Sequence, residues 1–220
     1  MIDLSDKTAA RPAQDRRVKR REQTRAKLIE AAETLFARQG VERTRINEIT
    51  DEADVGFGSF YNHFESKDAL VAAVLSETAA AHAEAIVSMT AGVDDPAEVI
   101  AIAHRYFVRL ARLQPDWAWL VVRLEQSHDA LLETLRPYAK ADLERAIAAG
   151  RLDVPDVNVA LFAGGGALLA VARGVLEDRL GSEADVQHAE GVLRLFGMAP
   201  AEAAEVASRP LPDPLARDAA

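Results

Sequence analysis

Apolar side chains recur three and four residues apart along most of the chain, and no other feature of the sequence constrains the fold so strongly. In residues 21–39 the apolar side chains fall on one face of a helix, and Gly40 follows at a position that commonly ends one. Asp95 followed by Pro96 is typical of a helix N-terminus. The sequence has no alternating apolar pattern of useful length for a β-strand and no internal repeat. It therefore predicts an all-α protein of about nine helices.

Several of the other predicted helices are marked by residues that typically begin or interrupt a helix. Ser66 is expected to cap the next long helix, and Asp156 a later one. Ser182 and Asp185 have the spacing of a capping box, which predicts the start of a last helix. Pro137 is expected to kink or split the helix that contains it.

Charge is distributed unevenly along the chain, whose net charge is −9. Residues 1–67 carry 13 basic and 12 acidic side chains, whereas residues 68–220 carry 13 and 23. Contact with nucleic acid is therefore expected at the N-terminal end. The absence of cysteine excludes disulfides and thiolate metal sites. No signal peptide and no membrane span are recognised, so a cytoplasmic protein is expected.

The segment 45–70 has the pattern of two short helices joined by a tight turn at Asp54. Such a turn often needs a positive φ, which Asp tolerates better than most residues other than Gly. Phe60 and Phe64 are expected to pack inward. The second short helix, over about residues 57–64, then presents aromatic, hydroxyl and amide groups outward, on Phe57, Ser59, Tyr61, Asn62 and His63. A face of this composition suits the major groove of DNA, which is about 12 Å wide.

The stretch AKLIEAAETLFARQGVERTRINEITDEADVGFGSFYNHFESKDAL resembles the DNA-binding domain of TetR-family regulators. The matching features are the A-A-x-x-L-F helix, the Gly-Val-x-x-Thr segment before the second helix, and Tyr61-x-His63-Phe64-x-x-Lys67. The resemblance covers roughly residues 21–75, and the helical pattern expected downstream agrees with the family.

The resemblance implies two sets of DNA-contacting residues. Phosphate-contact or positioning roles are implied for Thr44, Arg45, Tyr61, His63 and Lys67, and base-facing roles for Asn47, Phe57, Gly58 and Ser59. Arg45 and Asp54 depart from the family, which often has Thr and Gly there. Arg45 could strengthen a phosphate contact or reach a base edge, so the base preference stays open. The alternatives are structural: core packing for Tyr61 and Phe57, packing or capping for His63, and a solvated side chain for Lys67.

Four segments are predicted: a disordered basic arm (1–20), a helix-turn-helix domain (21–67), a helical ligand-binding and dimerisation domain (68–208) and a flexible tail (209–220). The arm ends in the basic run Arg16-Arg17-Val18-Lys19-Arg20, which continues into Arg21. It could enter a minor groove of DNA, or it could be a solvated tail, and the sequence leaves both alternatives open.

Helix-turn-helix proteins commonly dimerise on two half-sites, so a palindromic operator is expected. Residues of about 157–198 are predicted to form the homodimer interface, because two helices there carry apolar side chains over a wide arc. The resemblance implies a four-helix bundle across the dimer axis, and burial within one subunit is the alternative. Gly164, Gly165 and Gly166 weaken one of these helices by roughly 2–3 kcal/mol relative to alanine. Close helix approach, a kink or space for a ligand could each explain them.

A small-molecule site is predicted among the middle helices, which hold most of the remaining aromatic residues. An apolar cavity with a few polar groups is the usual form of such a site, and the resemblance implies an inducer pocket in this domain. The candidates are His104, Phe107, Trp117, Trp119, Leu120, Arg123, Tyr138 and Phe162. A plain hydrophobic core is the alternative for each of them.

These features predict a dimeric, sequence-specific transcriptional repressor that an unidentified small apolar or amphipathic ligand releases from its operator. No catalytic grouping is recognised, and the five histidines lack metal-ligand spacing, so no enzymatic activity, metal or cofactor is expected. The alternatives are an all-α partner-binding protein without DNA affinity and a transcriptional activator of the same fold.

Overall fold

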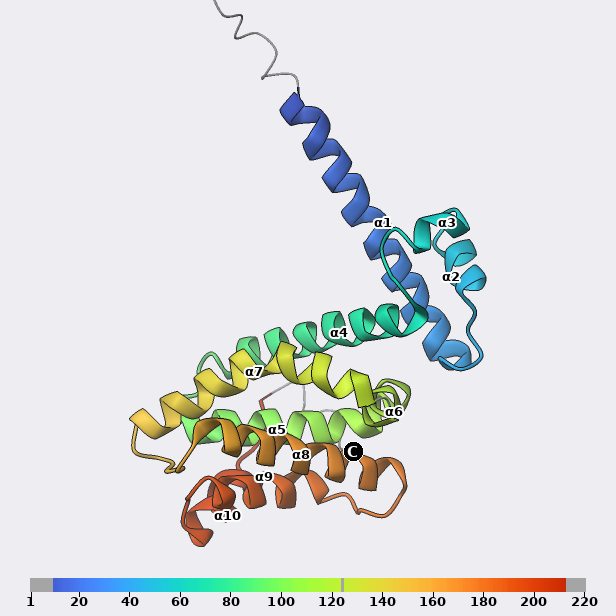
Figure 1. Ribbon diagram of the computed structural model, residues 1–220. Coiled ribbons are helices and arrows are strands. Elements are labelled where there is room, and N and C mark those ends of the chain that lie inside the picture. Colours follow the sequence, from blue (N-terminus) through green and yellow to red (C-terminus); the bar gives the residue numbers. More distant parts are fainter. Residues whose placement is uncertain (1–9, 124, 213–220) are drawn as a thin grey trace, which may run out of the picture. The chain divides into compact units, whose positions relative to one another are not determined.

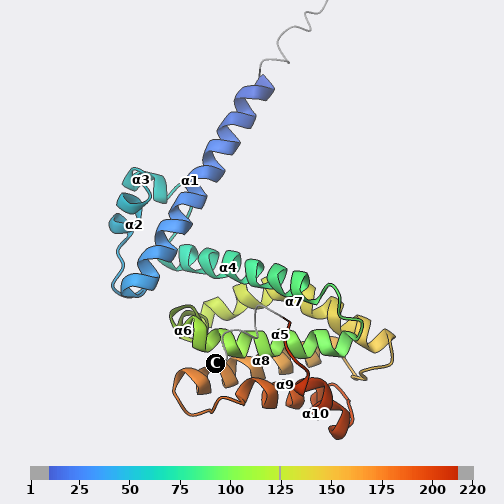
Figure 2. The same cartoon turned by 180° about the vertical axis from the view of Figure 1, so that it is seen from behind.

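The computed structural model describes residues 10–123 and 125–212, with side chains described for 17–36, 38–122 and 133–212. This part of the chain forms ten α-helices and no β-strand, so the all-α prediction is confirmed (Figures 1 and 2). The helices are α1 (Ala10–Gln39), α2 (Ile46–Glu52), α3 (Phe57–Phe60), α4 (Lys67–Thr90), α5 (Pro96–Leu113), α6 (Pro115–Arg123), α7 (Glu125–Ala148), α8 (Val157–Leu176), α9 (Ala184–Leu195) and α10 (Pro200–Ser208).

Two compact units make up the chain, and they divide between Val74 and Leu75, inside α4. The sequence predicts this boundary earlier, after residue 67. The difference has a packing reason, because Leu70, Val71 and Val74 in the first turns of α4 are buried and lie on the N-terminal side of the division.

α5 is the central helix of the second unit. It packs against α6, α7, α8, α9 and α10, and both views show it between α7 on one side and α8 and α9 on the other (Figures 1 and 2). Its side chains enter three separate apolar clusters, for example through Ile100, Val108 and Tyr106. Because α5 is surrounded in this way, its few polar side chains also meet neighbouring helices.

Three predicted helix caps are confirmed by their hydrogen bonds. The Asp95 carboxylate accepts from the backbone N–H of Ala97 at 3.1 Å, and Asp156 accepts from Val159 at 2.9 Å. The Ser66 hydroxyl accepts from the N–H of Ala69 at 3.1 Å. Each bond satisfies a donor that the first turn of the helix leaves unpaired.

The capping box predicted at Ser182 is wrong. α9 begins at Ala184, and its N-cap Glu183 makes no side-chain capping bond. Asp185 is instead buried and accepts from Arg105 Nε at 3.2 Å and Arg109 Nε at 2.8 Å, both on α5. Two guanidinium groups outcompete a backbone amide for one carboxylate, because charge-assisted hydrogen bonds are the stronger ones.

The two ends of the described chain are more ordered than the sequence predicts. Residues 10–20 extend α1, whereas residues 1–9 of the predicted arm lie outside the described residues. α10 is an additional helix, after which the guanidinium of Arg209 pairs with Asp95 at 3.1 Å and Glu98 at 2.6 Å, and Leu211 is buried. The predicted tail therefore begins too early, and its residues 213–220 lie outside the described residues.

Three further helices, α7, α4 and α8, can be compared with sequence predictions. α7 runs as one helix through Pro137, so of the two effects predicted for this proline, a kink or a split, the split does not occur. α4 and α8 are long and apolar enough to cross a membrane by length and composition alone, where the sequence led us to expect no span. In α8 much of the apolar surface is exposed, with Val159 at 67 % and Phe162 at 57 %. Exposed apolar faces of this kind are typical of interaction surfaces.

Candidate nucleic-acid interface and ligand cavity

The turn between α2 and α3 has the geometry that the sequence predicts. Asp54 adopts a φ of +52°, in the left-handed region, and the backbone N–H of Val55 donates to the carbonyl of Thr50 at 3.0 Å. An Asp side chain tolerates this conformation, which explains how the turn forms without the glycine common in the family. α2 and α3 are thereby held as a compact pair.

The second short helix is shorter than expected, because α3 ends at Phe60 and turns follow through His63. Phe60 and Phe64 are buried, as predicted. Phe57 and Tyr61 are 54 % and 55 % exposed, and their rings meet edge to face with centroids 5.7 Å apart. Neither is a core residue in this structure. The pair forms an aromatic surface on the outer side of the N-terminal unit.

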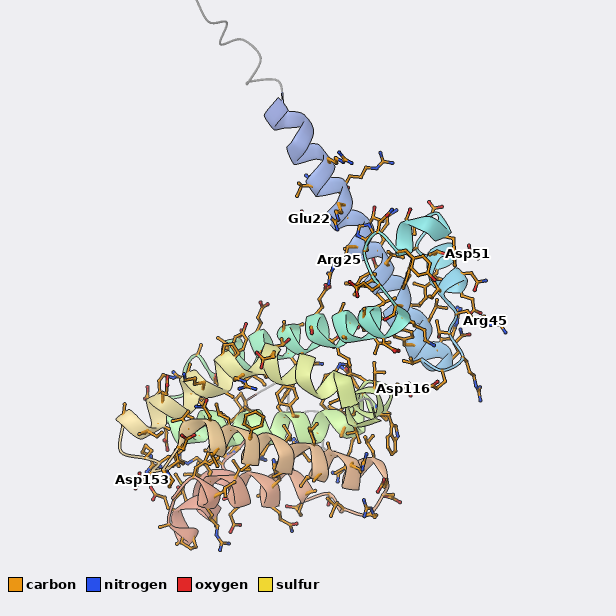
Figure 3. All side chains as sticks on the ribbon, in the orientation of Figure 1. Glu22, Arg25, Arg45, Asp51, Asp116 and Asp153 are labelled. Atoms are coloured by element: carbon orange, nitrogen blue, oxygen red, sulfur yellow. The ribbon has the colours of Figure 1, made fainter. Side chains whose placement is uncertain are left out.

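The other predicted base-facing residues lie around this aromatic pair in sequence and differ in exposure. Asn47 and Gly58 are exposed, whereas Ser59 is half-buried. Arg45 is exposed and projects from the outer side of the unit, just before α2 (Figure 3). The backbone N–H of Arg45 donates to the Glu48 carboxylate at 2.7 Å. This bond fixes the Arg45 backbone at the start of α2, whereas the Arg45 side chain stays exposed.

Thr44 and Lys67 act inside the N-terminal unit. Thr44 is 1 % exposed, and its hydroxyl donates to the carbonyl of Gly40 at 2.8 Å. The Lys67 ammonium donates to the carbonyls of Val41 at 2.9 Å and Thr44 at 3.2 Å. Both residues therefore stabilise the loop between α1 and α2, and Lys67 is not a freely solvated lysine. For Thr44 this geometry favours the positioning role over a direct phosphate contact.

His63 is half-buried next to basic residues of α1. Burial lowers its pKa, and the charges of Arg21 and Arg25 lower it further. Arg21 also donates to the carbonyl of Asn62 at 3.4 Å, and the Arg25 guanidinium lies 5.4 Å from the centre of the Phe64 ring. The end of the α3 region is thus packed against α1, which gives His63 a neutral imidazole beside cationic side chains.

A cavity of about 150 Å³ lies within the second unit. Side chains of α4, α5, α7 and α8, and Phe196 at the end of α9, form its walls. Four of the predicted ligand residues line it: His104, Phe107, Tyr138 and Phe162. Because these four come from three helices, only the tertiary fold brings them together.

The remaining predicted ligand residues do not line this cavity. Trp117 packs instead against the ring of His82, with centroids 5.2 Å apart, and Trp119 packs against an apolar cluster that includes Val108. Leu120 is half-buried outside the lining, and the side chain of Arg123 lies outside the described residues.

Sequence reasoning missed two charged residues of the lining, Arg136 and Asp142, both on α7. The Arg136 guanidinium lies 4.9 Å from the centre of the Phe162 ring and 3.1 Å from the Glu133 carboxylate. Asp142 accepts from Arg145. The available signal was the spacing of Leu135, Ala139 and Asp142, which places a carboxylate on the otherwise apolar face of one helix.

His104 on α5 pairs with His188 on α9 at one edge of the cavity. His104 Nδ1 lies 3.0 Å from His188 Nε2, and the ring centroids are 5.0 Å apart. Burial lowers the pKa of His104 to about 3, helped by the charge of His188, and burial lowers the pKa of His188 to about 4. Both imidazoles are therefore neutral near pH 7. In the described residues no group of three or more His, Asp or Glu side chains is arranged to hold a metal ion.

Comparisons with known families cover both units. The family described as "Bacterial regulatory proteins, tetR family" matches residues 28–74, and "Tetracyclin repressor-like, C-terminal domain" matches residues 95–209. The chain belongs to the TetR family. As a TetR-family protein it is a DNA-binding transcriptional regulator, with the α2–α3 surface in its DNA-binding domain and the cavity in its C-terminal domain.

Individual relatives agree with this assignment. This TetR-family protein is 32 % identical to HTH-type transcriptional repressor Rv3405c of Mycobacterium tuberculosis, over 84 % of the chain and 97 % of the relative. RolR in complex with resorcinol has a TM-score of 0.80 and 36 % identity, covering 89 % of the chain and 98 % of RolR. FadR of Bacillus subtilis in complex with stearoyl-CoA, at 18 % identity and a TM-score of 0.60, covers 79 % and 98 % and shares the fold alone.

Proposed function

We propose that this TetR-family protein is a homodimeric repressor that binds a palindromic operator through the α2–α3 surface and is released by a small ligand in the cavity. The observation that carries the DNA-binding part is the exposed Phe57–Tyr61 pair, because large aromatic side chains are rarely left in water without a partner. The relationship to a named repressor, Rv3405c, supports repression over activation.

The residues of this surface divide by what they present to DNA. Arg45, Asn47, Phe57, Gly58 and Ser59 are proposed to face the bases, since this part of the surface, just before α2, within α2 and at the start of α3, is largely exposed. Tyr61 and His63 are proposed to contact phosphates. Lys67 and Thr44 are proposed to support these contacts by holding the loop before α2.

The cavity supports an effector with a single aromatic ring. An apolar cavity of about 150 Å³ has the size that accommodates benzene in other proteins. RolR, which shares both the fold and 36 % identity, was crystallised with resorcinol, a benzene ring with two hydroxyl groups. We therefore propose a monocyclic, hydroxyl-bearing aromatic compound as the class of effector.

The apolar faces of α8 and α9 support the homodimer. Val159 and Phe162 on α8 are more than half exposed, as is Leu195 at the end of α9 at 53 %. A second copy of the same face would remove them from water, and a two-fold axis would place two DNA-reading surfaces about one turn of DNA apart.

Effector binding is proposed to act through α4. Ala83, Ile86 and Val87 of α4 line the cavity, whereas the first turns of the same helix belong to the DNA-binding unit. A ligand that favours one position of α4 would shift the distance between the two DNA-reading surfaces, provided that its affinity differs between the two states.

Operator binding tests the proposal directly. We expect the full chain to bind a site in the DNA flanking its own gene in a gel-shift assay and to reduce transcription from it in a reporter. Tyr61→Phe should weaken binding to all sequences alike, and Phe57→Ala should change base preference by about 1–3 kcal/mol. Leu113→Ala, which truncates an exposed apolar residue of α5, is the matched control. An intact dimer that binds none of this DNA would favour the partner-binding alternative, and increased transcription would favour activation.

A further inference from the structure

We propose that the His104–His188 pair is the group of the cavity that hydrogen-bonds a neutral hydroxyl of the effector, with His104 making the contact and His188 positioning it. The inference rests on the proposed function, because it specifies how the same cavity recognises its ligand. Neither histidine belongs to a metal cluster, and neither has another assigned role in the structure.

The ring of His104 is held by His188 and lies near the backbone of α8. Its Nδ1 lies against His188 Nε2 at 3.0 Å, and His188 is itself buried on α9. On the α8 side, a Cβ atom at Gly164 would lie 3.8 Å from His104 Cε1 and 3.0 Å from Phe196 Cζ. A Cβ at Gly164 would crowd the Phe196 ring but would make only an ordinary van der Waals contact with His104. Close packing of α8 against Phe196 is thus a reason for glycine at this position of the triplet.

This placement leaves Nε2 as the nitrogen of His104 that is available to the cavity. His104 is part of the cavity wall, and among the described side chains no group other than His188 hydrogen-bonds its ring. The cavity around it is lined mainly by apolar residues. A polar atom that faces such a space without a partner gains a hydrogen bond when a suitable ligand binds.

The other polar residues of the lining come from α7, and the two charged ones have partners of their own. Arg136 pairs with Glu133 and lies over Phe162, and Asp142 accepts from Arg145. Tyr138 is 37 % exposed, so its hydroxyl end has access to water. His104, on α5, makes one hydrogen bond, to His188, and its second ring nitrogen has no partner among the described side chains.

The chemistry of a neutral histidine pair indicates which ligand group fits. Burial keeps both imidazoles neutral, so one N–H lies between the rings. If His104 Nδ1 donates to His188, then His104 Nε2 accepts from the ligand; if His188 donates, Nε2 carries a proton and donates. A hydroxyl can take either role, whereas a carboxylate can only accept, so it fits one tautomer alone and would also bring its charge into a mainly apolar cavity, which burial opposes.

Phenol and toluene form a matched pair of probes, because they differ by a hydroxyl in place of a methyl group. Their dissociation constants are measured by calorimetry on the full-length wild type, on His104→Phe and on the control Phe107→Leu, which alters an apolar wall. We expect His104→Phe to weaken phenol binding about tenfold or more while toluene binding changes little, since one hydrogen bond is removed. Phe107→Leu should affect both probes alike. Operator binding by each variant confirms that it is folded.

A spectroscopic measurement separates recognition from a merely structural role. In chain labelled with ¹⁵N-histidine, phenol should shift the Nε2 resonance of His104 and toluene should not. His188→Gln keeps a hydrogen-bonding group at this position, whereas His188→Leu does not. The Gln variant should therefore retain more of the preference for phenol over toluene than the Leu variant. If His104→Phe lowers the affinity for phenol and for toluene equally, or if phenol leaves the Nε2 resonance unmoved, the inference is overturned while the effector proposal stands. A wild type that binds neither probe would overturn both.

Discussion

Lys67 illustrates how a side chain can match a family motif and still act in a way that the motif does not reveal. Its position implies a phosphate contact, but the ammonium group donates to two backbone carbonyls of the loop before α2. Thr44 is buried in the same loop. A local sequence pattern cannot reveal hydrogen bonds to residues more than twenty positions away along the chain. Only the structure therefore shows how exposed Lys67 is and which groups it contacts.

Acid should destabilise the second unit through its histidine pair. The folded pKa values of His104 and His188, about 3 and about 4, lie below the unfolded value of 6.5, so the unfolded chain binds more protons below that pH. The contribution of the pair to the free energy of unfolding is therefore fully present above about pH 6.5. It falls as the pH falls, by roughly 2 kcal/mol per histidine between about pH 7 and pH 5. Urea denaturation across this range measures it.

The His104→Phe, His188→Leu double variant is the control for this dependence, because it removes both histidines of the pair and leaves His82, whose pKa burial also lowers, as the remaining contribution of this kind in the unit. Its stability should change much less between about pH 7 and pH 5. Asp185 does not interfere, since Arg109 and Arg105 hold its pKa below the usual value despite the opposing effect of burial, and it acts only in more acidic solution. A wild-type stability that stays flat over this range would contradict the assignment of two neutral histidines.

At the scale of elements, helix length was harder to predict than helix existence. α3 is four residues long where the pattern suggested about eight, because turns replace its second half while Phe60 and Phe64 still reach the core. α1 is longer than predicted, since the residues of the basic arm are good helix formers and need no buried face to continue a helix already begun.

Truncation of α1 tests whether this basic extension contacts DNA. Removing residues 1–20 deletes the exposed side chains of Arg17, Lys19 and Arg20. If they bind phosphates, the slope of log K against log salt should become shallower by about 0.9 for each phosphate that is no longer neutralised. The triple substitution of these three residues by Gln keeps the helix and isolates the charge. A slope that neither change affects would identify the extension as a solvated helix.

At the scale of the whole molecule, the two units place their exposed apolar surfaces differently. In the N-terminal unit the exposed aromatic residues gather at α3, whereas in the second unit the two most exposed large apolar side chains, Val159 and Phe162, lie on α8, and Leu195 lies at the end of α9. This distribution fits a protein that binds DNA with one unit and a second copy of itself with the other. The proposed dimer would also account for the apolar composition of α8.

Val159→Glu tests the dimer. Val159 is 67 % exposed and lies outside the cavity lining, so a charge there should leave the subunit folded but oppose burial against a second copy. We expect a monomer by light scattering and a loss of operator affinity of about 100-fold or more, because the two half-sites are no longer bound together. Leu113→Glu, which places the same charge on α5, should remain dimeric. A dimer that persists in Val159→Glu would require another interface.

The sequence alone determined the features that depend on neighbouring residues: the all-α class, the caps at Asp95 and Asp156, the turn at Asp54 and the outward face of α3. These follow from spacing and backbone preference, which act within a few residues. The tertiary structure decided what depends on distant ones: the cavity walls, the role of Lys67, and the pairing of His104 with His188 across 84 positions. Such contacts form only when packing brings separate helices together, and no local pattern encodes which helices will meet.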